Sequence, residues 1–446
     1  MSTSTPRRTL RSVPATPADP APAAEQPQPA GCDEGCRVTN RRSLLRGAIL
    51  GGTSVMVGGA SITYSGAAAA APGLVTPAPR PASSVIVVVS MRGAADGLSI
   101  VVPHAELAYY AGRPTTAIPK ASLLGADAQF GFHPAMAPLM PLWKAGRLAA
   151  VHATGLPVAN RSHFAAMEEL EDAAPGSETR SGWLNRLVGA NGDHATVEAL
   201  AVGNGLPALV SGPQPTMSFD ELDSAELAGG NARDNRSPRR KALNRLWATQ
   251  GGEMGGSVRT ALTSLVDLAP AQDVRPAYRS AYPGQLGGAL QDVARVLKAD
   301  IGVAAVTVDT GSWDMHVNMG GPGGGWMVDN VSELAGSIAT FFTDLGPVAD
   351  KVTLVTITEF GRRVQENGSR GTDHGWGGVM LVAGAGVKGG YYSRWPGLEN
   401  TLDADLAVTT DYRDVLAEVV TARTSASAAA VFPGHSWSSL GMMRAA

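Results

Sequence analysis

Five short polar clusters hold the residues of this sequence that are best suited to do chemistry. Asp314 and His316 lie two positions apart in one cluster, so in an extended segment both side chains point to the same face. A carboxylate and an imidazole on one face are a common half-site for zinc or manganese. Asp373 and His374, which stand among four glycines, are further candidate ligands. The clusters are residues 92–97, 160–164, 309–318, 358–362 and 371–378.

Ser162 and Arg161 are the candidates for attack on a substrate. Ser162 directly precedes a helical pattern, so its hydroxyl could be a simple helix N-cap. The same hydroxyl could be a nucleophile at a helix N-terminus, where backbone N–H groups favour an anion and Arg161 adds a positive charge. The sequence leaves both interpretations open.

Glu359, Arg362 and Asp96 are the candidates from the remaining clusters. Glu359 follows a β-branched run and could be a metal ligand or a general base. Arg362 could bind an anion or face water. Asp96 could be a metal ligand, or it could cap the segment that begins after it.

Six short apolar runs predict the strands of a sheet. They are continuous rather than alternating with polar residues, which is typical of strands covered on both faces. Segments with helical spacing separate them, and this predicts a three-layer α/β/α sandwich with a largely parallel sheet. Ligands collect at the carboxyl ends of such strands, so we expect the five clusters to converge on one edge. The expected strands are residues 85–89, 148–152, 199–202, 302–309, 352–358 and 379–383, and the expected helices are 134–145, 162–172, 285–297, 331–345 and 412–421.

One large domain is expected over residues 84–434. Between residues 206 and 282 the pattern degrades into polar and helical pieces, which we interpret as an inserted helical cap. A Ser-Pro pair at 237–238 fits the N-cap and first residue of a helix there. Residues 72–84 form a Pro/Ala/Ser linker and residues 435–446 a C-terminal tail.

Residues 1–71 are similar to a twin-arginine export signal. Arg41 and Arg42 precede an uncharged stretch that is diluted with Gly, Ser and Thr and ends in small residues near Ala71. This predicts an exported protein located in the periplasm, in the cell envelope or outside the cell. The alternative is an uncleaved membrane anchor, because the stretch exceeds the ~20 residues that span a bilayer.

Charge and cysteine content bear on two kinds of function, nucleic-acid binding and thiol chemistry. Residues 72–446 hold 29 Lys and Arg against 35 Asp and Glu, a net charge of −6, so a nucleic-acid surface is not expected. Cys32 and Cys36 both precede the twin arginines. A chain cleaved after them therefore has no disulfide and no thiol catalysis.

Several motifs together resemble a known bacterial family. The series RGAADGL, FHPAMAPL, VHATG, RSHF, WDMH, TEFGR, NGSRGTDHGWGG and TTDYRDV resembles the exported family catalogued as domain of unknown function 1501, over about residues 84–434. The resemblance implies the fold of the alkaline-phosphatase and sulfatase superfamily. It also implies metal-ligand roles for Asp314, His316 and His374, which resemble Asp and His ligands of that superfamily.

Two strand ends depart from the phosphatase pattern. Glu359 and Phe360 stand where phosphatases have Asp-His, and Arg92 and Gly93 stand where they have a ligand Asp, with Asp96 displaced. The resemblance therefore implies one metal site rather than two.

The resemblance implies an exported, metal-dependent hydrolase of phosphate or sulfate esters. One divalent metal, zinc or manganese, would be held by the ligands named above. Ser162 or a water activated by the metal would attack, and Arg161 or Arg362 would stabilise the anionic transition state. The alternative is a non-catalytic envelope protein that binds an anionic or polysaccharide ligand in the same crevice. The expected partners are a small anionic ester or an envelope polysaccharide, and the twin-arginine export machinery.

Replacing both Arg41 and Arg42 by lysine should retain the precursor inside the cell, because the export machinery reads the arginine pair. Cell fractionation and immunoblotting measure this retention. Mature protein outside the cytoplasm at the normal level would contradict the assignment of the signal.

Overall fold

The computed structural model describes most of the chain after the predicted signal, together with two short strands inside it. The described residues are 52–57, 60–65, 81–174, 181–191, 197–203, 205–227, 238–275 and 282–444. Arg41 and Arg42 lie outside this range, so the predicted export motif remains a prediction. Among the described residues, no helix has the length and apolar character required to cross a membrane.

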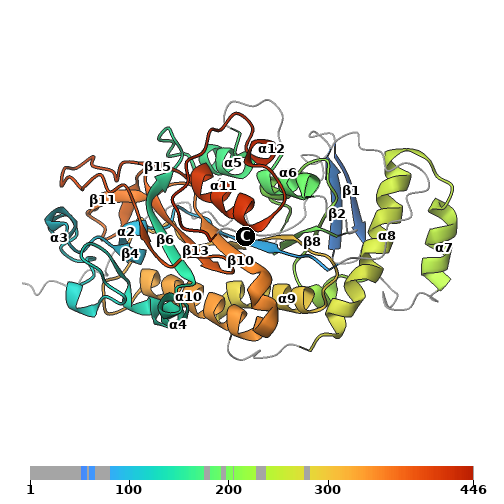
Figure 1. Cartoon of the computed structure of the whole chain (residues 1–446), viewed down its shortest axis with the longest axis horizontal. Helices are drawn as coiled ribbons and strands as arrows, with labels where there is room; N and C mark the ends of the chain where they lie inside the picture. The colour runs from blue at the N-terminus through green and yellow to red at the C-terminus, as the bar shows by residue number, and fades with distance from the viewer. Residues whose placement is uncertain are drawn as a thin grey trace, which may run out of the picture. The chain divides into compact units, whose positions relative to one another are not determined.

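An eleven-stranded sheet forms the centre of the described domain (Figure 1). Its order is β1-β2-β8-β7-β9-β3-β10-β13-β6-β14, and β15 also pairs with β6. The strands are β1 (Gly52–Val57), β2 (Ala60–Ser65), β3 (Val85–Met91), β6 (Leu148–Gly155), β7 (Ala199–Val202), β8 (Thr216–Phe219), β9 (Ala305–Thr310), β10 (Val352–Ile357), β13 (Gly378–Gly384), β14 (Gly390–Tyr392) and β15 (Thr410–Asp411); two smaller pairs are β4 (Val101–Val102) with β5 (Gly131–Phe132), and β11 (Arg362–Glu366) with β12 (Thr372–His374).

Strand direction decides which ends of the strands meet. Strands β8, β7, β9, β3 and β10 are parallel to one another, and Val87 of β3 lies between Val306 and Leu354. Strand β13 runs antiparallel to both β10 and β6. Its amino end therefore lies at the same edge as the carboxyl ends of β3, β6, β9 and β10.

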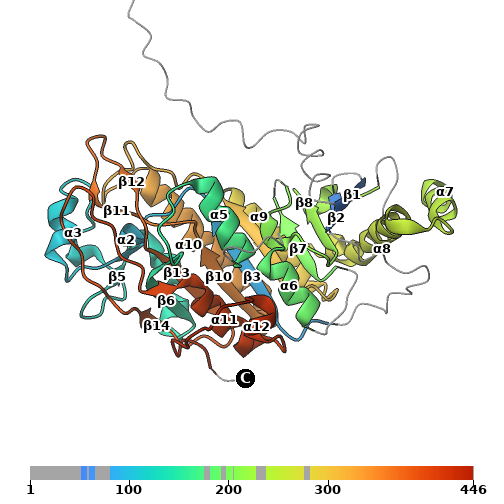
Figure 2. The same ribbon diagram turned by 90° about the horizontal axis from the view of Figure 1, so that it is seen from above.

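Helices cover both faces of the sheet, which confirms the predicted three-layer arrangement (Figure 2). Because side chains alternate along a strand, Val85, Val87 and Val89 join the hydrophobic core under α8, α9 and α10, whereas Ile86 and Val88 join the core under α5, α6, α11 and α12. The helices are α2 (Gly97–Ile100), α3 (Leu107–Gly112), α4 (Met140–Lys144), α5 (His163–Asp172), α6 (Trp183–Ala190), α7 (Pro238–Trp247), α8 (Gly252–Asp273), α9 (Gly284–Lys298), α10 (Trp326–Leu345), α11 (Tyr412–Arg423) and α12 (Ala428–Val431).

The region expected to be a helical insertion contains a sheet strand as well as helices. Strand β8 pairs in parallel with β7 and extends the sheet before α7 and α8 begin. The pattern TMSF is too short to show a period, which is why sequence reasoning missed this strand. Helix α7 begins at Pro238, as the Ser-Pro pair predicts.

Part of the stretch interpreted as the apolar region of the signal pairs with the sheet. Strands β1 and β2 form a hairpin, and β2 runs antiparallel to β8 with Ala60 opposite Phe219. This pairing was not among the expectations for the segment, which were a signal or an anchor.

A buried ion pair ties the loop after β3 to β11. Arg113 donates to both carboxylate oxygens of Asp96, at 2.5 and 3.0 Å, and to the carbonyl oxygens of Arg363 and Val364 at 2.9 Å each. Ser99 also donates to Asp96. Both members of the pair are buried. Asp96 is thus engaged as a structural anion, which differs from its predicted role as a metal ligand.

Replacing Arg113 by methionine should lower the free energy of unfolding by about 3–5 kcal/mol, because it leaves the Asp96 carboxylate buried without its partner. Urea unfolding of the purified protein measures the change. Lys351→Met is the matched control, since its pair with Asp300 is partly exposed and should be worth under about 1 kcal/mol. Equal effects of the two substitutions would contradict the structural role of the Arg113 pair.

Candidate metal centre

Four segments that are far apart in the sequence meet at one edge of the sheet. His163 is the first residue of α5, which follows β6, and Asp314 and His316 lie in the loop after β9. Glu359 follows β10, and His374 ends β12, just before β13. His374 comes before its sheet strand whereas the others follow theirs, and the reversed direction of β13 is what places it among them.

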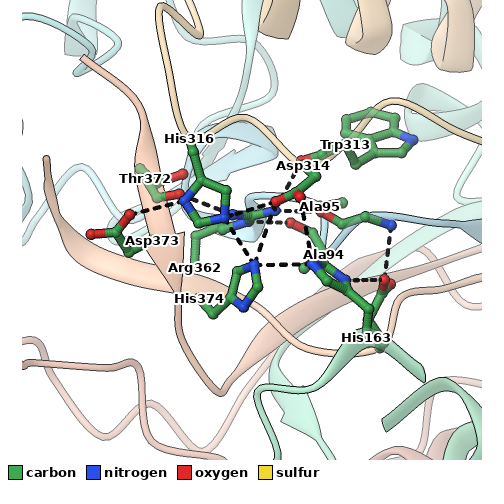
Figure 3. Close-up of polar contacts among 12 residues, drawn as sticks. Ala94, Ala95, His163, Trp313, Asp314, His316, Arg362, Thr372, Asp373 and His374 are labelled. Carbon is green, nitrogen blue, oxygen red and sulfur yellow. Dashed lines mark hydrogen bonds and ion pairs between the residues drawn. The ribbon is translucent and has the colours of Figure 1, made fainter. Parts of the chain in front are cut away.

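His163, His316 and Asp314 lie around the ring of His374 (Figure 3). The Nε2 atom of His374 lies 2.9 Å from Nε2 of His163 and 2.9 Å from Nε2 of His316. Asp314 places Oδ1 at 3.0 Å from Nε2 of His316 and at 3.4 Å from Nε2 of His374, and Oδ2 at 3.6 Å from Nε2 of His163. The ligand atoms of His163, Asp314 and His374 all lie within 4.8 Å of one another, so these three side chains form the candidate site for one metal ion, and His316 lies beside this group.

Each of the three histidines has its other ring nitrogen held by an acceptor. Nδ1 of His163 donates to Glu359 at 2.8 Å, and Nδ1 of His316 donates to Asp373 at 2.9 Å. Nδ1 of His374 donates to the carbonyl oxygen of Arg161 at 3.0 Å. These partners assign the proton of each neutral ring to Nδ1 and leave Nε2 with a lone pair. Two Nε2 lone pairs at 2.9 Å would repel each other, so each of these contacts has room for a proton or a metal ion between the rings.

The electrostatics of the cluster favour a positive charge. Hydrogen bonds to Asp314 and Glu359 raise the pKa of His163 to about 9. Burial by itself would raise the pKa of Asp314, but hydrogen bonds from His163, His374 and Arg362 hold it well below its usual range. The carboxylate therefore stays ionised and can serve as a metal ligand.

The Arg362 side chain connects the loops that carry the candidate ligands. Its guanidinium has no exposed surface, and it donates to Asp314 at 2.7 Å and to the carbonyl oxygen of Ala94 at 2.7 Å. It also donates to the carbonyl oxygens of Gly93, Trp313 and Thr372. These contacts use the donors of Arg362, so the side chain holds loops together. Binding of a substrate anion, which was one of the roles expected for Arg362, would require these contacts to open.

Two glycines allow the loops to approach this closely. A Cβ atom on Gly371 would lie 2.2 Å from the carbonyl group of His316. Gly93 has a φ of +110°, and a Cβ there would lie 2.6 Å from the backbone nitrogen of Asp314. Larger residues at either position would displace a candidate ligand.

Ser162 and Arg161 lie beside the centre without forming part of it. Ser162 is exposed at the N-terminus of α5, and its side chain forms no capping hydrogen bond. Its backbone N–H donates to Asn160. The Arg161 side chain pairs with Asp405, so its contribution to the centre is the carbonyl oxygen that holds His374.

Of the predicted ligands, the structure brings Asp314, His316 and His374 together. Asp373 contacts the centre only through His316, and Asp96 lies in the Arg113 pair described above. His163, which is part of the candidate site, was not predicted as a ligand from the sequence. The available signal was its position next to Ser162 in a polar cluster.

Comparison with known proteins gives one family and several distant structural likenesses. The family model described as protein of unknown function (DUF1501) matches residues 82–427. No curated protein matches the sequence significantly.

Similar solved structures include three bacterial proteins. The zinc complex of the C-terminal periplasmic domain of EptC from Escherichia coli is 10% identical over 75% of this chain and 77% of that chain, with a TM-score of 0.31. Lipoteichoic acid synthase LtaP from Listeria monocytogenes is 8% identical over 71% and 68%, with a TM-score of 0.30. The sulfatase PsFucS1 from Pseudoalteromonas sp. is 9% identical over 74% and 66%, also with a TM-score of 0.30.

TM-scores of this size do not specify a shared activity, so the chemistry of this chain has to follow from its own side chains. The family match is of a different kind, because it covers more than three quarters of the sequence. The resemblance expected from the motifs is thereby confirmed, and the chain belongs to the DUF1501 family of proteins of unknown function.

Proposed function

We propose that this protein is an exported, metal-dependent hydrolase of phosphate or sulfate esters. The observation that carries the proposal is the group of His163, Asp314 and His374, whose ligand atoms all lie within 4.8 Å of one another, with the Nδ1 atoms of both rings anchored. Zinc and manganese both accept imidazole and carboxylate ligands. A divalent ion bound there would act as a Lewis acid toward the ester and would activate the attacking oxygen.

The residues of the chain divide the remaining work. His163, Asp314 and His374 would hold the ion. Glu359 and the carbonyl oxygen of Arg161 would keep the rings of His163 and His374 in the tautomer that binds metal. The side chains of these three ligands and of His316 are between 24% and 38% exposed, so a substrate can reach the centre from solvent.

Ser162 is the side chain best placed to act as nucleophile. Its hydroxyl is exposed and precedes His163 directly, at the N-terminus of α5. Backbone N–H groups at a helix N-terminus favour a developing anion. Arg161 is the nearest cation in sequence, although its pair with Asp405 has to open before it can bind a substrate anion.

A non-catalytic role is the second candidate, and the departures from the phosphatase pattern favour it. Glu359 and Phe360 stand where phosphatases have Asp-His, so the ligand set of a second metal ion is incomplete. In that case the protein would bind an anionic or polysaccharide component of the envelope without hydrolysing it. Export remains part of both proposals and is supported by the twin arginines.

The purified protein from zinc- or manganese-supplemented medium should contain about one metal ion per chain. Chelation should lower its melting temperature, because a ligand at 1,000 times its Kd stabilises the native state by about 4 kcal/mol. His163→Ala and His374→Ala should lose the metal and the response to chelator. His435→Asn is the control, since His435 binds Asp414 outside the cluster. A metal-free wild type without any thermal response to zinc or manganese would refute the site.

Hydrolysis of nitrophenyl phosphate and nitrophenyl sulfate separates the two candidate functions. If Ser162 is the nucleophile, Ser162→Ala should lower kcat at least about a hundredfold while metal content stays unchanged. Ser427→Ala, at the N-cap of α12, is the matched control. If Ser162→Ala keeps full activity while His374→Ala loses it, the attacking group is water and not Ser162. A metal-loaded wild type that hydrolyses neither ester, nor any of a wider ester panel, would favour the binding role.

A further inference from the structure

Helix α7 concentrates positive charge in a chain that is otherwise acidic. Residues 233–247 hold six Arg and Lys residues against one Asp, which leaves 23 basic against 34 acidic residues in the rest of residues 72–446. Within α7 itself there are four basic residues and no acid. This segregation of charge is independent of the metal centre.

One face of α7 packs on α8 and the other is open. Arg240, Leu243 and Trp247 share a face at helical spacing; Arg240 donates to the carbonyl oxygen of Leu262, and the carbonyl oxygen of Trp247 accepts from Arg259. These contacts fix which side of the helix faces the domain. The basic residues on the remaining surface are therefore not needed to hold the helix in place.

Three cations occupy the open side. Arg239, Lys241 and Arg245 are all exposed, and among the described residues none of them has an acidic partner. Lys241 and Arg245 are four positions apart on one side of the helix, so their charges repel each other, and a negatively charged partner bound there would relieve this repulsion.

Two large apolar side chains are exposed on α7 and at the start of α8. Leu246 is 60% exposed at the end of α7, and Met254 is 50% exposed in the first turns of α8. A nucleic-acid backbone would leave both side chains in water. An anionic lipid surface accommodates both kinds of group, because cations bind its headgroups while aliphatic side chains enter the interface.

The position of α7 suits a docking role. Both overall views place α7 and β11–β12 at opposite ends of the sheet (Figure 1, Figure 2). A surface bound at α7 would therefore leave the metal centre accessible. We infer that α7, with Leu246 and Met254, is a docking element for an anionic lipid surface.

Co-sedimentation with vesicles tests this inference with the full chain. Vesicles of phosphatidylcholine with 30% phosphatidylglycerol should bind the wild type more tightly than pure phosphatidylcholine, and added salt should weaken the binding. The triple variant R239Q/K241Q/R245Q should bind the anionic vesicles roughly 100-fold more weakly, at about fivefold per cation. Leu246→Ser should weaken binding further without changing its dependence on salt.

The matched control removes three exposed lysines elsewhere, as K120Q/K144Q/K388Q. It should bind within about twofold of the wild type, because its lysines are scattered rather than gathered on one helix. Unchanged melting temperatures show that the variants fold. Equal binding by the α7 variant and the wild type would overturn the inference, and so would equal losses in both triple variants. Binding of duplex DNA in preference to anionic vesicles would replace the lipid surface by a nucleic acid.

Discussion

The arrangement of the candidate metal centre depends on the hydrogen bonds of one buried group, the guanidinium of Arg362. It bonds at once to the loop after β3, to the loop after β9 and to β12, and it holds the Asp314 carboxylate directly. An uncompensated guanidinium without contact with water is costly, so the carbonyl groups and Asp314 have to surround it for the domain to fold. The geometry of the ligands is thus a consequence of satisfying one buried cation.

Pairing of the strands in the sheet brings together segments from distant parts of the sequence, which Arg362 alone does not do. Strands β3, β9 and β10 end at one edge, and β13 begins there because it runs the other way. Glu359 connects a loop at the end of a sheet strand to a candidate ligand. Its carboxylate accepts a hydrogen bond from the backbone N–H of Gly93 and orients the ring of His163. Strand order, loop contacts and imidazole tautomers therefore form one connected arrangement.

Much of this architecture could be predicted from local patterns. Continuous β-branched runs identified β3, β6, β7, β9, β10 and β13, because burial on both faces removes polar alternation. Asp314, His316 and His374 were recognisable as candidate ligands, since short spacing and flanking glycines have few explanations in packing. Strand β8 escaped because four residues show no period.

The roles of Glu359, Asp373 and Arg362 could not be predicted, because each depends on a partner that is distant in sequence or in a loop of unknown path. Glu359 is buried against His163, 196 positions away. Arg362 looks like a surface cation in the sequence TEFGRR, and only the fold shows that its donors are used internally. Asp96 illustrates the same difficulty, since its buried partner Arg113 comes from a separate helix end.

The separation of the ligands along the chain also bears on when a metal can bind. His163 and His374 are 211 positions apart, and they meet only after β6, β10 and β13 have paired. A partly folded chain offers only local pairs such as Asp314 with His316, so metal uptake at the proposed site would follow folding instead of guiding it. Intrinsic affinities of such sites follow a fixed order among metals, and availability decides which one is bound. Under the proposed function, the compartment in which this chain folds would therefore decide which metal it meets: a chain exported already folded would carry an ion from the cytoplasm, whereas one that folds afterwards would take its ion from the envelope.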